Sequence, residues 1–67
     1  MEDFVIQTIK ENGGVIYYDT LVSMVAERGM SVKDARKLIS NMVLDGTLFF
    51  DKYWDVTLHL DKGGDMK

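Results

Sequence analysis

Apolar residues recur at helical spacing near the start of the chain, and polar residues fill the positions between them. They form one face of a predicted helix over residues 2–12 and comprise Val5, Ile6 and Ile9. We expect this helix to end at Gly13 and Gly14, because glycine readily adopts the left-handed conformation that helix C-termini commonly need. Residues 15–18 are β-branched or aromatic, a composition that favours a short strand.

Two further stretches have the same helical period. One lies between Asp19, whose carboxylate is predicted to cap the helix, and Gly29; its apolar stripe combines Leu21, Met24 and Val25 with Arg28, widened by Val22 and Ala26. The other covers residues 31–45, with Ser31 as the predicted N-cap and Gly46 after its end. Its predicted core face is the clearest in the chain and contains Ala35, Leu38, Ile39, Met42 and Val43.

The last patterned region alternates with period two and predicts a β-hairpin with strands at 47–51 and 55–60. The inner face is expected to carry Leu48, Phe50, Val56, Leu58 and Leu60, and the outer face Phe49, Thr57 and His59. The hairpin carries four aromatic residues, Phe49, Phe50, Tyr53 and Trp54, which is more aromatic surface than two strands can easily cover. We expect Tyr53 and Trp54 at the tip to fold back and close the core. The alternatives are that they remain exposed as an interaction surface, or that they lie against DNA sugars or stack on unpaired bases with Lys52 on a phosphate.

Length and composition narrow the class of protein. With 67 residues, the chain can form one small core, so we expect a single domain over residues 1–60 and a flexible tail at 61–67. No disulfide or thiolate metal cluster is possible without cysteine, and no apolar run is long enough to cross a membrane. The acidic start is unlike a signal peptide, so a cytoplasmic or other intracellular location is expected.

Catalytic and metal-binding chemistry is sparse. His59 is the only imidazole, and no nucleophile with an orienting partner accompanies it. One histidine with a few aspartates falls short of a zinc site. We therefore expect a protein that is not an enzyme and that binds no cofactor or metal.

The order helix, strand, helix, tight turn, helix, hairpin resembles that of winged-helix (winged helix-turn-helix) domains over roughly residues 2–60. The turn at residues 29–31, the third-helix core residues Ala35, Ile39 and Met42, and Gly46 with Leu48 carry this resemblance. The chain is also similar to the C-terminal winged helices of archaeal minichromosome maintenance helicases and of other replication proteins. The resemblance implies a three-helix α+β fold. Many members bind duplex DNA through the third helix and the hairpin, called the wing, whereas others hold proteins.

The outward face of the third predicted helix has the residue types that DNA recognition requires. Residues 31–41 carry three cations and one carboxylate, a net charge of +2, whereas the rest of the chain carries −5. Arginine and asparagine recognise base edges, and lysine contacts phosphates. A helix in the major groove would use Ser31, Lys33, Arg36, Lys37, Ser40 and Asn41, and the wing would add Lys52 and Tyr53. A transcriptional regulator or replication accessory factor is the favoured hypothesis.

Two other interpretations stay open. The cations of this helix are also what any solvated helix face contains, and a net charge of −3 is unusual for a DNA-binding domain. In the second hypothesis the protein acts as a subunit or adaptor, with Phe49, Tyr53 and Trp54 against a protein partner or a second copy of the chain. Three or four cations per chain allow only weak, nonspecific DNA binding by a monomer.

Overall fold

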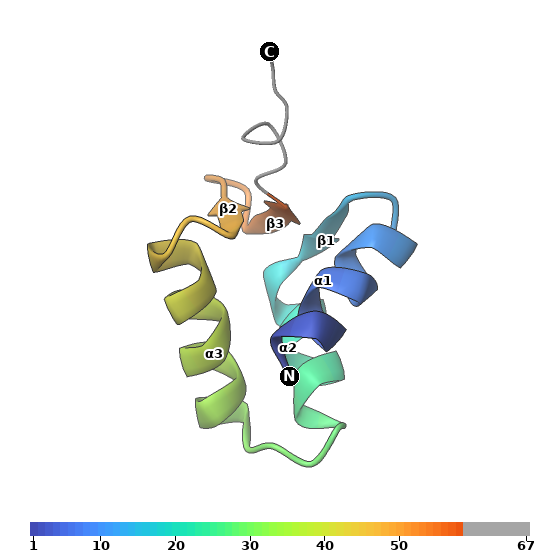
Figure 1. Ribbon diagram of the computed structural model, residues 1–67, viewed down its shortest axis with the longest axis vertical. Coiled ribbons are helices and arrows are strands. Elements are labelled where there is room, and N and C mark those ends of the chain that lie inside the picture. The colour runs from blue at the N-terminus through green and yellow to red at the C-terminus, as the bar shows by residue number, and fades with distance from the viewer. Residues whose placement is uncertain (59–67) are drawn as a thin grey trace.

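The structure of the protein, a computed structural model, describes residues 1–58. Its elements are α1 (Glu2–Glu11), β1 (Val15–Tyr17), α2 (Tyr18–Ala26), α3 (Val32–Leu44), β2 (Leu48–Phe50) and β3 (Asp55–Leu58). This order confirms the predicted α+β class and matches the topology of a winged-helix domain (Figure 1). The predicted end of the last strand at residues 59–60, the outward position of His59 and the predicted tail at residues 61–67 lie outside the described residues.

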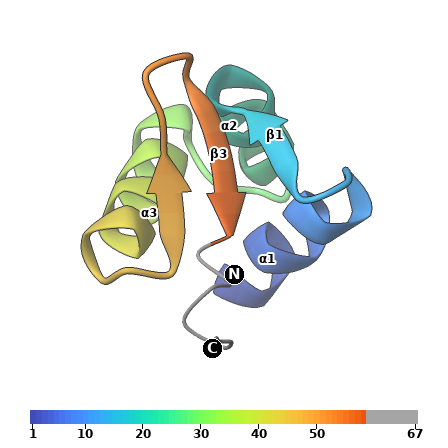
Figure 2. The same ribbon diagram turned by 90° about the horizontal axis from the view of Figure 1, so that it is seen from above.

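The three strands form one antiparallel sheet in the order β1-β3-β2. Its central strand, β3, pairs with both neighbours, and Val56 and Thr57 have a partner on either side. Ile16, Val56 and Phe50 form one row across the sheet, facing the helices, and Val15, Thr57 and Phe49 form a row on the outer face. Figure 2 looks onto that outer face, with the helices behind the sheet.

The core lies between the three helices and the inner face of the sheet. It consists of the buried side chains of Val5, Ile9, Ile16, Leu21, Val22, Val25, Ala35, Ile39, Met42, Leu48 and Val56. The stripe predicted for α3 is confirmed, because Ala35, Ile39 and Met42 are at most 1% exposed. Leu38 and Val43 are partly buried against the same cluster. Burial of one face of α3 fixes which side chains point to solvent.

The inner face of α2 is rotated from the predicted one. Met24, which the helical period placed on the core stripe, is exposed, whereas Val22, predicted only to widen that stripe, is buried. Tyr18 lies one turn before Val22 and packs against the core from the same side of the helix. The buried face of α2 therefore includes Tyr18 and Val22, because the hairpin packs against this face at the first turn of the helix.

The predicted cap of α2 is wrong. The helix begins at Tyr18, so Asp19 lies within its first turn, and the N-cap is Tyr17, which makes no side-chain cap bond. The backbone N–H of Tyr18 donates instead to the carbonyl oxygen of Trp54 at 2.7 Å. A hairpin carbonyl thus satisfies a free N–H at the helix start, the role that was expected of the Asp19 carboxylate.

The connection between α2 and α3 follows the sequence prediction. Gly29 has φ of +110°, a left-handed conformation that is costly for residues with a Cβ. Ser31 is the N-cap of α3, and its Oγ accepts a hydrogen bond from the backbone N–H of Asp34 at 3.0 Å. The turn and the cap fix where α3 starts and which of its residues face outward.

Among residues 1–58 there is no helix with the length and apolar character that a membrane-spanning segment requires.

Candidate nucleic-acid interface

One face of α3 is open to solvent along its whole length. Its exposed polar side chains are those of Lys33, Asp34, Arg36, Lys37, Ser40 and Asn41, and all of them except Asp34 are predicted DNA contacts. The opposite face of the helix lies in the core. Within residues 1–58, no carboxylate forms an ion pair with any of the three cations. Their charge is therefore presented to solvent.

Ser31, predicted as a further DNA contact, has a structural role. Its Oγ is engaged as the N-cap acceptor for Asp34. The residue lies at the start of α3, ahead of Lys33 on the same helix. The structure therefore places Ser31 at one end of the exposed face.

The hairpin tip carries the other predicted DNA contacts, Lys52 and Tyr53, and both are exposed. The Oδ1 atom of Asp51 accepts hydrogen bonds from the backbone N–H groups of Tyr53 at 2.8 Å and Asp55 at 3.2 Å. The Nζ atom of Lys52 lies 5.3 Å from the centre of the Tyr53 ring. The tip is thus a defined turn rather than an unconstrained loop.

Three aromatic rings meet where the hairpin crosses the start of α2. The centroids of Tyr18 and Phe50 lie 5.4 Å apart, those of Tyr18 and Trp54 5.6 Å, and those of Phe50 and Trp54 5.2 Å, the last pair edge to face. We call Tyr18, Phe50 and Trp54 the aromatic cluster. These separations lie within the range favoured by aromatic pairs.

The aromatic cluster corrects two expectations. Phe50 was predicted to be buried on the inner face; it lies on that face but is 37% exposed, because it sits at the end of β2 beside the tip. Trp54 folds back as predicted, yet it closes the core only in part and stays 53% exposed. Tyr53 does not fold back and is 67% exposed.

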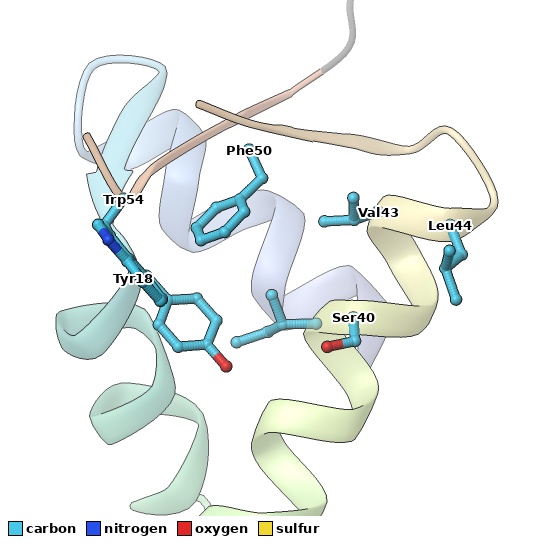
Figure 3. A pocket seen from close by; sticks show the side chains of 7 residues that line it. Tyr18, Ser40, Val43, Leu44, Phe50 and Trp54 are labelled. Atoms are coloured by element: carbon cyan, nitrogen blue, oxygen red, sulfur yellow. The ribbon is translucent and has the colours of Figure 1, made fainter. Parts of the chain in front are cut away.

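A groove of about 310 Å³ runs between the aromatic cluster and α3. Its α3 side is formed by Ile39, Ser40, Val43 and Leu44. Figure 3 shows the Tyr18 and Ser40 side chains entering from opposite sides, each with its hydroxyl directed toward the groove. The walls are otherwise apolar, so the groove combines an aromatic wall, an aliphatic floor and two hydroxyl groups.

A second hollow of about 350 Å³ adjoins the groove and shares Tyr18 and Trp54 with it. Arg36 lines this hollow together with Tyr17 and Asp19. The Arg36 guanidinium group on α3 and the Trp54 indole on the hairpin therefore border one continuous surface. This surface joins a predicted DNA contact to a predicted protein contact.

The third residue of the predicted protein-interaction set, Phe49, is not part of this surface. It is 55% exposed on the outer face of the sheet, where it pairs with Thr57. Conversely, sequence reasoning missed Tyr18 as a member of the site. The adjacent pair Tyr17 and Tyr18 was the available signal, and Tyr18 is the ring that lies beside the hairpin.

Comparison of the chain with family models, curated proteins and solved structures finds no match. Functional inference therefore rests on the site itself. Residues 1–58 contain no group of three or more side chains placed to hold a metal ion.

Proposed function

We propose that the protein is a small winged-helix DNA-binding protein, a transcriptional regulator or replication accessory factor, that places α3 in the major groove and its hairpin on the backbone. The observation that supports this most is that Lys33, Arg36 and Lys37 of α3 are exposed and form no ion pair within residues 1–58, in a chain whose remaining residues carry a net negative charge. A local positive surface on an acidic protein concentrates the attraction for phosphates on one element.

The dimensions and chemistry of α3 fit this role. Its 13 residues make a helix about 20 Å long, and the major groove of B-DNA, about 12 Å wide, admits an α-helix. Arg36 and Asn41 have the donor and acceptor groups that recognise guanine and adenine edges. Lys33 and Lys37 have the reach to contact phosphates, and Lys52 would add a contact from the hairpin tip.

The proposal is tested by a matched pair of charge reversals. Lys37→Glu and Lys10→Glu change the net charge equally, and both residues are exposed on helices, but Lys10 lies on α1, away from the site. We expect Lys37→Glu to weaken binding to mixed-sequence duplex DNA about tenfold, because it replaces a phosphate contact with repulsion. Lys10→Glu should change the affinity much less.

Fluorescence anisotropy of a labelled duplex measures both affinities, and circular dichroism verifies that both variants fold. Equal weakening by the two substitutions would mean that only net charge matters, and the proposed role of α3 would be wrong. An NMR titration with the same duplex should show shift changes confined to α3 and the hairpin.

A second function, protein binding, is favoured by one observation. Leu44, at the rim of the groove, is 84% exposed, and Trp54 across the groove is half exposed. Exposed apolar residues grouped around a groove are typical of interaction sites. The simplest form of protein binding is self-association, which sedimentation detects. A measured mass of 7.6 kDa at high concentration, that of one chain, would exclude a homodimer.

A further inference from the structure

We propose that the groove between α3 and the aromatic cluster binds an unpaired base of single-stranded DNA, stacked on Trp54. This inference deepens the proposed function and rests on it. It names the substrate class as DNA with single-stranded ends or gaps, rather than continuous duplex alone.

The first argument is the presentation of Trp54. Its ring is held edge to face against Phe50 and close to Tyr18, and its backbone is tied at both ends. The Trp54 N–H donates to the carbonyl of Asp51 at 3.1 Å, and its own carbonyl accepts from Tyr18. The indole therefore has a fixed position while half of its surface stays open. Such a ring is a platform on which a base can stack without first being ordered.

The second argument is the composition of the groove. A base has apolar faces and polar edges, and the groove offers both kinds of surface. Ile39 and Val43 supply aliphatic contacts, and the hydroxyls of Tyr18 and Ser40 can donate to or accept from a base edge. An aliphatic side chain from a protein partner would fill the apolar walls but leave both hydroxyls without a new partner.

The third argument is charge. Arg36 borders the adjoining hollow, and Lys52 lies two residues before Trp54 at the hairpin tip. Cations beside an aromatic surface suit a strand whose bases stack and whose phosphates are anionic. Asp19 also borders that hollow, where its carboxylate would repel a phosphate but can accept a hydrogen bond from an N–H of a neighbouring unpaired base, such as N3–H of thymine. We therefore place the stacked base in the groove, with its edge toward the Tyr18 and Ser40 hydroxyls, and the backbone toward Lys52.

A base within a duplex cannot use this groove, because both of its faces are covered by neighbouring base pairs. Only an unpaired base can enter without the cost of unstacking. The inference therefore predicts that a duplex with a single-stranded thymidine overhang binds more tightly than a closed dumbbell duplex, which has no ends.

Trp54 is the only tryptophan in the chain, so its fluorescence reports directly on the groove. We expect titration with oligothymidylate at low salt to quench this emission, and the dumbbell duplex to bind with little quenching. Trp54→Asn removes the ring and suits the backbone, since asparagine tolerates the positive φ of 67° found here. It should lower the affinity for labelled oligothymidylate about tenfold, and Trp54→Phe should retain most of it.

The control is Phe49→Ser, which removes an equally exposed aromatic ring from the other face of the sheet and should leave oligothymidylate affinity unchanged. Oligothymidylate binding that leaves the emission unaltered, or equal affinities for Trp54→Asn and the unsubstituted protein, would overturn the inference.

The experiments distinguish a failure of the base-binding inference from a failure of the proposed DNA-binding function. Tight binding of the dumbbell duplex without any binding of oligothymidylate would refute the groove as a base site and leave the role of α3 intact. Failure of both probes would refute both proposals. If, in addition, sedimentation gave a dimer that Trp54→Asn dissociates, the groove would be assigned to a second copy of the chain.

Discussion

At the scale of single residues, the same helix contains the most protected and the most exposed apolar side chains of the site. Ile39 is 1% exposed and forms the floor of the groove, whereas Leu44 is 84% exposed at its rim. Trp54 is notable for its backbone: φ of 67° is costly for a bulky residue, by about 1–2 kcal/mol. Backbone hydrogen bonds to Asp51 and Tyr18 hold it there. A bulky side chain kept in this conformation is consistent with a role for its exposed ring.

The difference between Ile39 and Leu44 leads to a prediction on stability. Ile39→Val deletes one buried methylene and should lower the free energy of unfolding by about 1 kcal/mol. Leu44→Ala deletes more atoms but should change it by no more than about 0.5 kcal/mol, because they are already in water. Thermal unfolding followed by circular dichroism measures both. A larger loss for Leu44→Ala would show that this side chain is covered in solution, as in a self-associated form.

At the scale of elements, the site depends on how α3 and the hairpin are terminated. Ser31 caps α3, and Asp51 organises the turn that carries Lys52, Tyr53 and Trp54. Asp51 accepts two backbone hydrogen bonds, one on each side of Trp54 in the chain. The exposed indole is therefore positioned by a carboxylate that faces the backbone of its own turn.

Asp51 does not line the groove, but its replacement should disturb the groove by loosening the turn that positions Trp54. Asp51→Ala removes the Oδ1 atom that accepts both hydrogen bonds and should lower the free energy of unfolding by about 1 kcal/mol. The emission of Trp54 should shift to longer wavelength as the indole becomes more exposed. Asp51→Asn keeps an acceptor oxygen and should restore most of both properties. If Asp51→Ala left emission and stability unchanged, the turn would be fixed by other contacts.

At the scale of the whole molecule, charge is distributed unevenly. The protein has a net charge of −3, yet residues 31–41 carry +2. Acidic side chains elsewhere repel a polyanion, so under the proposed function the protein approaches DNA with α3 foremost. This arrangement would restrict orientation at the expense of affinity, since one copy can neutralise few phosphates.

The salt dependence of duplex binding tests this distribution. Three neutralised phosphates give a slope of log Kobs against log salt of about −3, which is shallow for a DNA-binding protein. Lys37→Glu should make the slope less negative by about 1. Anisotropy titrations of the dumbbell duplex at several salt concentrations provide the slopes. A value near twice the expected one would indicate that two copies bind together.

The sequence by itself determined the elements and the outward face of α3. Helical and two-residue periods, the glycine at position 29 and the Ser31 cap are local signals, and the structure follows them. The cations of α3 were predictable as exposed because a helix that buries one stripe must present the opposite one to solvent.

Only the tertiary structure decided the rest of the site. Tyr18 lies far from Phe50 and Trp54 in the sequence, and its contact with them depends on the hairpin crossing the start of α2. The same crossing supplied the carbonyl that replaced Asp19 as the cap. No local pattern encodes these outcomes, because each results from packing between elements that are distant in sequence.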